Sequence, residues 1–232
     1  MLPLMSLAVL VGIAAPQANL PDAAKLHRAL IERYTLMYTK YSGFEHKARI
    51  ESRIYHARSG ELDQRSTLLV KERSYFEQER DWSVLEYLLD GENQAPESYQ
   101  DRSERRPLLA PFGPDAKSHY LLAVVGRTKL NGSSALLVEL TPRQLTPRHF
   151  KGLAWISEAP LELLRLEGEI AAPPRGVRSI ELSIDFEAQN GYLRPTSTTS
   201  TVHVHVPLFF PHRRIVSTTH VKSSQAIKRR GS

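Results

Sequence analysis

The chain has 232 residues, of which 41% are hydrophobic and 24% charged, with 15 prolines, 12 glycines and no cysteine. This balance excludes a disordered or collagen-like protein, and the length is compatible with one globular domain. The net charge is +6, but the basic residues are spread along the chain without an aromatic-basic signature, so we expect no nucleic-acid partner.

Residues 1–18 are predicted to be a signal peptide and residues 19–232 a single domain. The mostly apolar run at residues 4–15 is shorter than the roughly 20 residues that span a bilayer, and it has the length of a signal-peptide core. Ala18 offers a small residue for cleavage, and a buried apolar helix is the alternative. Because the chain has no cysteine to carry a lipid, we expect an exported protein that is not lipid-anchored.

The first element after residue 18 is a predicted helix. Pro21 and Asp22 favour its initiation, because proline fits the first turn and an acidic side chain suits the positive end of the helix dipole. Apolar residues then recur every three or four positions: Leu26, Leu30, Tyr34, Met37 and Tyr41. This spacing predicts one apolar stripe on a helix that ends at Ser42-Gly43.

From residue 43 the hydrophobic period changes to two. Between residues 43 and 57 the even positions are mostly apolar, including Phe44, Ile50 and Ile54, and the odd positions are almost all charged. Such alternation is typical of an antiparallel strand with one face in water. It returns at residues 178–187 and 196–206, where the apolar positions are Ile180, Leu182, Ile184, Phe186, Val202 and Val204.

Two Asn-Gly pairs, at residues 131–132 and 190–191, predict two-residue hairpin turns. Further strands are predicted at residues 62–78, 152–157, 161–170 and 213–223. Residues 82–91 fit either a strand or two helical turns, and residues 92–114 are predicted to be a long loop that covers an opening. The chain therefore has about nine to ten strands behind one helix.

One helix is too narrow to cover this sheet. A helix is about 10 Å across, whereas nine strands spaced about 4.8 Å apart span about 40 Å. Unless the sheet rolls up, apolar surface is left without cover, and we expect a hydrophobic cavity there. A plain packed core is the alternative for the same apolar residues.

Three segments of the chain resemble the LolA-like family of bacterial outer-membrane lipoprotein-sorting proteins. Residues 152–170, GLAWISEAPLELLRLEGEI, resemble that family's G-x-x-W strand, its turn and the arginine-containing strand that follows. Residues 136–143, LLVELTPR, resemble the preceding strand end, and residues 190–196, NGYLRPT, resemble a later hairpin. In overall pattern the resemblance extends over residues 44–223.

The resemblance implies an α+β fold. It would be an incomplete (half-open) antiparallel β-barrel with an N-terminal helix and a loop/helix lid over an apolar cavity for acyl chains. It also implies an arginine in the barrel that holds the closed state, for which Arg49, Arg53, Arg65 and Arg73 are alternatives. The expected cavity-lining residues are Phe44, Ile50, Ile54, Trp155, Ile180, Leu182, Ile184, Phe186, Val202 and Val204.

We interpret the chain as a soluble, monomeric periplasmic carrier of lipid or lipoprotein acyl chains. A membrane-bound donor or acceptor protein is a further expected partner. Moving one acyl CH₂ out of water is worth about 0.8 kcal/mol, so an acyl chain must be covered to cross an aqueous compartment. The first alternative is an envelope sensor or regulatory module on the same fold, because a fold does not determine a function.

The second alternative is a metal-dependent hydrolase. His203 and His205 share one strand face, and His212 or His220 could supply a third zinc ligand. The hydroxyl-rich residues on that same face are typical of a solvent-facing surface: Ser197, Thr199 and Thr201. The sequence also contains no nucleophile elbow, P-loop, dinucleotide-binding glycine pattern or H-E-x-x-H motif. We therefore expect no catalytic residue, no metal and no cofactor.

Overall fold

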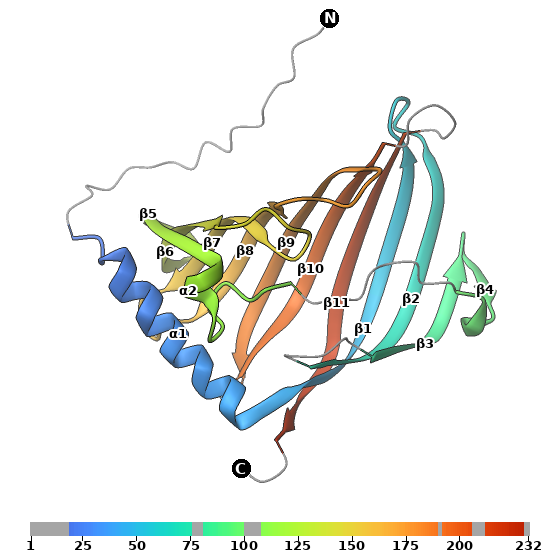
Figure 1. The fold of residues 1–232 in the computed structure, drawn as a ribbon. Helices are drawn as coiled ribbons and strands as arrows, with labels where there is room; N and C mark the ends of the chain where they lie inside the picture. The colour runs from blue at the N-terminus through green and yellow to red at the C-terminus, as the bar shows by residue number, and fades with distance from the viewer. Residues whose placement is uncertain (1–18, 76–80, 100–107, 190–191, 206–211, 230–232) are drawn as a thin grey trace, which may run out of the picture.

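The computed structural model describes residues 19–75, 81–99, 108–189, 192–205 and 212–229 (Figure 1). The predicted signal peptide and the Asn190-Gly191 turn lie outside these residues. The elements, in chain order, are α1 (Ala23–Lys40), β1 (Tyr41–His56), β2 (Leu62–Tyr75), β3 (Asp81–Leu89), β4 (Glu92–Gln94), the 3₁₀ turn η1 (Pro96–Ser98), α2 (Ala116–His119), β5 (Tyr120–Leu130), β6 (Ser133–Pro142), β7 (Phe150–Ser157), β8 (Leu163–Ile170), β9 (Val177–Gln189), β10 (Tyr192–Val204) and β11 (Arg213–Lys228).

All the strands belong to one antiparallel sheet, in the order β4-β3-β2-β1-β11-β10-β9-β8-β7-β6-β5. The sheet is open, with β4 and β5 at its edges, and it curves around α1 (Figure 1). The predicted α+β half-barrel is therefore confirmed. The sheet has 11 strands rather than nine or ten, because residues 82–91 contribute β3 and because the short β4 pairs with it.

The N-terminal helix forms as predicted. The carboxylate of Asp22 accepts a hydrogen bond from the backbone N–H of Lys25 at 2.8 Å and so caps the first turn. The helix ends at Lys40, earlier than the predicted Ser42-Gly43, because Tyr41 is already extended and pairs with Lys228 of β11. Sheet pairing thus competes with the last helical turn.

Among the described residues, no helix is long and apolar enough to cross a membrane.

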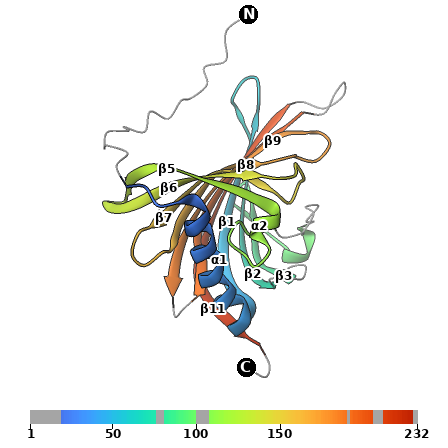
Figure 2. The same cartoon turned by 60° about the vertical axis from the view of Figure 1, so that its left-hand side comes forward.

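The two faces of the sheet differ in chemistry. We call the face that carries α1 the inner face and the opposite one the outer face (Figure 2). Directly paired residues of neighbouring strands share a face. One such inner-face row runs across six strands: Leu68, Ile50, Thr219, Thr198, Ile184 and Leu166. The outer face carries most of the charged side chains, as the alternation in β1 predicted.

The main core lies between α1 and the β6–β8 part of the inner face. Leu26, Leu30 and Tyr34 of α1 pack there on Val138, Ala154 and neighbouring buried residues. A smaller apolar cluster lies at the other side of the sheet, where Tyr99, after η1, contacts the rings of Trp82 and Tyr87. Both clusters are on the inner face, so the connection from β4 to β5 begins and ends on that face.

Two glycines bring β7 and β8 very close together. Gly152 pairs with Gly168, and a Cβ built on Gly168 would lie 2.1 Å from the carbonyl oxygen of Lys151 and 2.7 Å from the Cα of Gly152. Gly152 also has a φ of +154°, which L side chains rarely adopt. Neither position has room for a side chain.

In the β5–β6 turn, Asn131 and Gly132 both have positive φ, as a tight hairpin turn requires.

Candidate functional site

An apolar hollow of about 380 Å³ lies between α1 and the inner face. Its volume is within the range of about 300–1,000 Å³ that is usual for small-ligand sites. Aromatic and aliphatic side chains make up most of its wall, and the connection to α2 closes one side. The lining residues are Tyr34, Met37 and Tyr38 of α1, Phe44 of β1, residues 108–113, and Phe150, Leu163, Leu166, Ile184, Phe186, Leu193, Pro195 and Thr198.

The helix is tied to the sheet by polar contacts at both sides of the hollow. The backbone N–H of Leu163 donates to the hydroxyl of Tyr34 at 2.8 Å, and that of Leu193 donates to the sulfur of Met37 at 3.3 Å. Arg33 forms an ion pair with Glu162 at 2.5 Å. Burial raises the pKa of Tyr34 to about 12, so its hydroxyl stays protonated at neutral pH. The helix therefore contacts β8 on one side of the hollow and β10 on the other.

Nine of the ten predicted cavity residues lie on the inner face. Phe44, Ile184 and Phe186 line the hollow, and Leu182 packs against the main core. Ile50, Ile54, Ile180, Val202 and Val204 lie on the same face in the half that α1 does not cover, and each is partly exposed. Beyond the hollow the inner face thus continues as a mixed surface, in which aliphatic side chains lie beside the hydroxyl groups of Thr198, Ser200 and Ser217.

Trp155 is placed on the opposite face. It pairs with Leu137 of β6 and with Arg165 of β8, and Arg165 in turn bonds Asp185 on the outer face. The inner-face positions of β7 are the neighbouring Ala154 and Ile156, both fully buried. Both the even and the odd positions of this strand carry apolar residues, so the sequence could not decide which set faces the helix. Trp155 is not among the residues that line the hollow.

The four arginine alternatives also lie on the outer face. Arg49 and Arg53 occupy the charged positions of β1, Arg65 pairs with Arg53 and Arg73 pairs with Glu45. All four are exposed. In this structure none of them points into the hollow, so the arginine that the resemblance implies is not found at these positions.

The structure separates the histidines of β10, β11 and the residues beside them into different places. His203 lies on the outer face, with its Nε2 3.9 Å from a carboxylate oxygen of Glu181. The rings of His205 and His212 stack with their centroids 4.2 Å apart. His220 lies farther along the outer face, paired with Arg49. In the part of the chain that the structure describes, no three His, Asp or Glu side chains are grouped to hold a metal ion.

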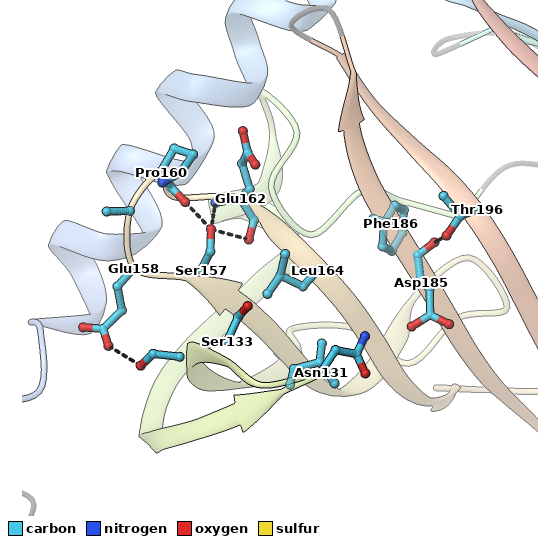
Figure 3. Close-up of a pocket in the computed structure, with 13 residues that line it drawn as sticks. Asn131, Ser133, Ser157, Glu158, Pro160, Glu162, Leu164, Asp185, Phe186 and Thr196 are labelled. Carbon is cyan, nitrogen blue, oxygen red and sulfur yellow. Dashed lines mark hydrogen bonds between the residues drawn. The ribbon is translucent and has the colours of Figure 1, made fainter.

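A second cavity, the polar cleft, lies where the turns at one end of β5–β8 meet β9 and β10. It has a volume of about 790 Å³, and its side chains come from the β5–β6 turn, from the β7–β8 turn with the start of β8, and from β9 and β10 (Figure 3). Hydroxyl and carboxylate groups alternate with a few apolar side chains around it. The lining residues are Leu130, Asn131, Ser133, Ser134, Ser157, Glu158, Ala159, Pro160, Glu162, Leu164, Asp185, Phe186 and Thr196.

Each carboxylate of the polar cleft is held by an arginine that is not part of the lining. Glu158 accepts from Arg127 at 3.1 Å, Glu162 from Arg33 and Asp185 from Arg165 at 2.7 Å. Burial alone would raise the pKa of Asp185, but hydrogen bonds from Arg165 and from the Ser197 hydroxyl outweigh it, and its pKa is lowered. The three carboxyl groups are therefore held in place by ion pairs or hydrogen bonds from arginines.

The residues that sequence reasoning missed come mainly from two places. Tyr34 and Met37 belong to the predicted apolar stripe of the helix, which was a usable signal. Residues 108–113 fall in the predicted loop and reach the hollow only because the chain crosses from the β4 edge of the sheet to the β5 edge. No local pattern shows such a crossing.

No protein-family model and no curated protein matches this chain. Solved structures that it is similar to include a LolA superfamily protein from Nitrosomonas europaea, with 12% identity, a TM-score of 0.43 and coverage of 86% of this chain and 92% of that one. A domain described as an outer membrane lipoprotein-sorting protein from Vibrio parahaemolyticus has 13% identity and a TM-score of 0.41, with coverage of 91% and 95%. A DUF1329 family protein from Desulfovibrio piger has 15% identity, the same TM-score and the same coverage.

These structures include the family that the sequence resembles. At such low identities and TM-scores they carry no conclusion about function, which has to be argued from the residues of this chain.

Proposed function

We propose that this protein binds an acyl chain of a lipid or lipoprotein in the hollow under α1 and carries it, without catalysis, through the periplasm. The observation that carries the proposal is the wall of the hollow, which among the described residues is almost wholly aromatic and aliphatic. Outside it, on the inner-face half that has no helix over it, Ile50, Ile180 and Val202 are partly exposed as well. Large exposed apolar surfaces in water are a feature of ligand or partner sites.

The chemistry of the wall suits reversible binding. About ten buried methylenes would contribute about 8 kcal/mol to affinity before the cost of immobilising the ligand. None of the side chains that line the hollow is charged, so affinity would scale with chain length. That property supports a carrier, because a ligand held by dispersion and hydrophobic contact can be passed to another apolar surface.

The test is uptake of a fluorescent fatty acid by the purified protein, with native mass spectrometry to detect lipid that co-purifies. We expect saturable uptake that Ile184→Asp abolishes, because a carboxylate in the hollow would have to be desolvated. Ser183→Asp is the matched control, since Ser183 is the neighbouring residue on the outer face, paired with Thr199 and Glu167. Absence of uptake by the wild-type protein, or equal uptake by both variants, contradicts the proposal.

A further inference from the structure

The hollow and the polar cleft lie against the same three strands. Successive residues alternate between them: Leu163 and Leu164 of β8, Ile184 and Asp185 of β9, and Pro195 and Thr196 of β10, the first of each pair lining the hollow and the second the polar cleft. Leu164 and Thr196 are the residues left without a partner at register shifts of their strands, so the two cavities are next to each other where the regular alternation is interrupted.

In this part of the sheet the pairing of β8 with β9 is interrupted, and we call this place the β8–β9 seam. The pairing of β8 with β9 runs from Glu169 and Glu181 to Arg165 and Asp185 and stops there. Beyond that point β9 continues and pairs with β10 alone, from Phe186 opposite Pro195 onward. The first N–H of β8 donates instead to Tyr34 of α1. Among the described residues, Leu163 and Phe186 are not paired with each other's strand.

Phe186 lies at this seam and, of the residues that the structure describes, is the one that lines both cavities. Figure 3 shows its ring across the polar cleft from Leu164. A phenylalanine ring changes rotamer without breaking a hydrogen bond, so its displacement would join the two cavities. An acyl chain could then lie in the hollow while the group attached to it stays in the polar cleft.

The groups around the polar cleft define what that attached group would be. Among the described residues, its polar lining consists of hydroxyl groups, one amide and three carboxyl groups, with no lysine or arginine. Carboxylates accept hydrogen bonds and repel anions. A headgroup rich in hydroxyl or ammonium donors and without net negative charge matches this surface, whereas a phosphoglycerol or free carboxylate does not.

We propose that the polar cleft is the headgroup subsite of the bound lipid, selective for a donor-rich, non-anionic headgroup, and that Phe186 is the gate through which the acyl chain reaches the hollow. This inference rests on the proposed acyl-chain function. It adds the chemical class of the ligand and its route of entry.

The first experiment measures displacement of a fluorescent fatty acid from the full chain by ligands with one palmitoyl chain and different headgroups. Monopalmitoylglycerol and lysophosphatidylethanolamine are expected to displace the probe at roughly tenfold lower concentration than lysophosphatidylglycerol, a difference of about one decade in affinity. Ser133→Trp, which fills the polar cleft, should reduce this preference to nearly one while palmitate still binds. Ser223→Trp, on the outer face of β11, is the matched control and should keep the preference.

The second experiment measures the association rate of the fluorescent fatty acid. Phe186→Ala is expected to raise it roughly tenfold by removing the gate, whereas Trp155→Ala, which truncates an aromatic side chain that lines neither cavity, should leave it unchanged. Absence of a headgroup preference, its persistence in Ser133→Trp, or an unchanged association rate in Phe186→Ala overturns this inference and leaves acyl binding intact. Absence of any probe binding by the wild-type protein overturns the proposed function and this inference with it.

Discussion

The two halves of the inner face both carry isoleucine and valine at alternate strand positions but have different surroundings. Under α1, Val138 and Ile156 are completely buried. On β1 and β9, Ile54 and Ile180 are only partly buried, because no helix of the described chain lies over them. Apolar alternation therefore specifies which face of a strand turns inward, and a separate element specifies whether that face is packed. The covered half should stabilise the fold, and the uncovered half should be available to a ligand.

The largest difference between the halves should appear on truncation of buried side chains. We expect Ile156→Ala to lower the free energy of unfolding by about 2–5 kcal/mol, because it leaves a cavity in a packed core. Ile54→Ala is expected to cost about 1 kcal/mol or less, because its side chain is partly in water already. Urea unfolding followed by circular dichroism measures both. Equal losses would show that the uncovered half is packed in solution.

The next largest loss of stability should come from widening the close contact between β7 and β8. Gly168→Ala should destabilise the protein by about 1–3 kcal/mol, as overpacking does, since the added Cβ would meet the Lys151 carbonyl. At Gly126, on the edge strand β5, a Cβ would meet nothing within 4 Å, so Gly126→Ala is the control and should be nearly neutral. Thermal unfolding midpoints compare the two. A tolerated alanine at Gly168 would mean that the covered half can widen.

The smallest effect concerns Asp185, which bonds Arg165 across the last pair of β8 and β9. Its pKa is lowered in the folded protein, so its stabilising contribution is fully present above the unfolded-chain pKa of about 3.9 and is lost as pH falls through the folded-state pKa. Asp185→Asn should cost up to about 1 kcal/mol at pH 7, since the pair is partly exposed. Unfolding experiments down the acid range should show the wild-type advantage disappear, and an advantage that is independent of pH contradicts this assignment.

Sequence reasoning predicted the strands and one helix because their periods are local. It placed Phe44, Ile184 and Phe186 on one face for the same reason, and that face proved to be the one that carries α1. Trp155 was misplaced because β7 is apolar at both alternations, so burial depends on its register with β6 and β8. The polar cleft was not predicted, because its serines and carboxylates come from three separate turns and strands that only the fold brings together.

The pairing of β1 with β11 has a consequence for how the chain folds. Strands β5–β11 form a meander of local hairpins, and β1–β4 form another, so each can nucleate within its own stretch of sequence. The pairing of β1 with β11, which connects the two meanders, joins Tyr41 to Lys228. These residues are almost at opposite ends of the described chain. Contacts of such long range are slow to form, because the chain loses the entropy of a long loop before the paired residues stabilise it. We therefore expect the β1–β11 pairing to form last, and the rate-limiting step of folding to be the docking of two preformed sheets.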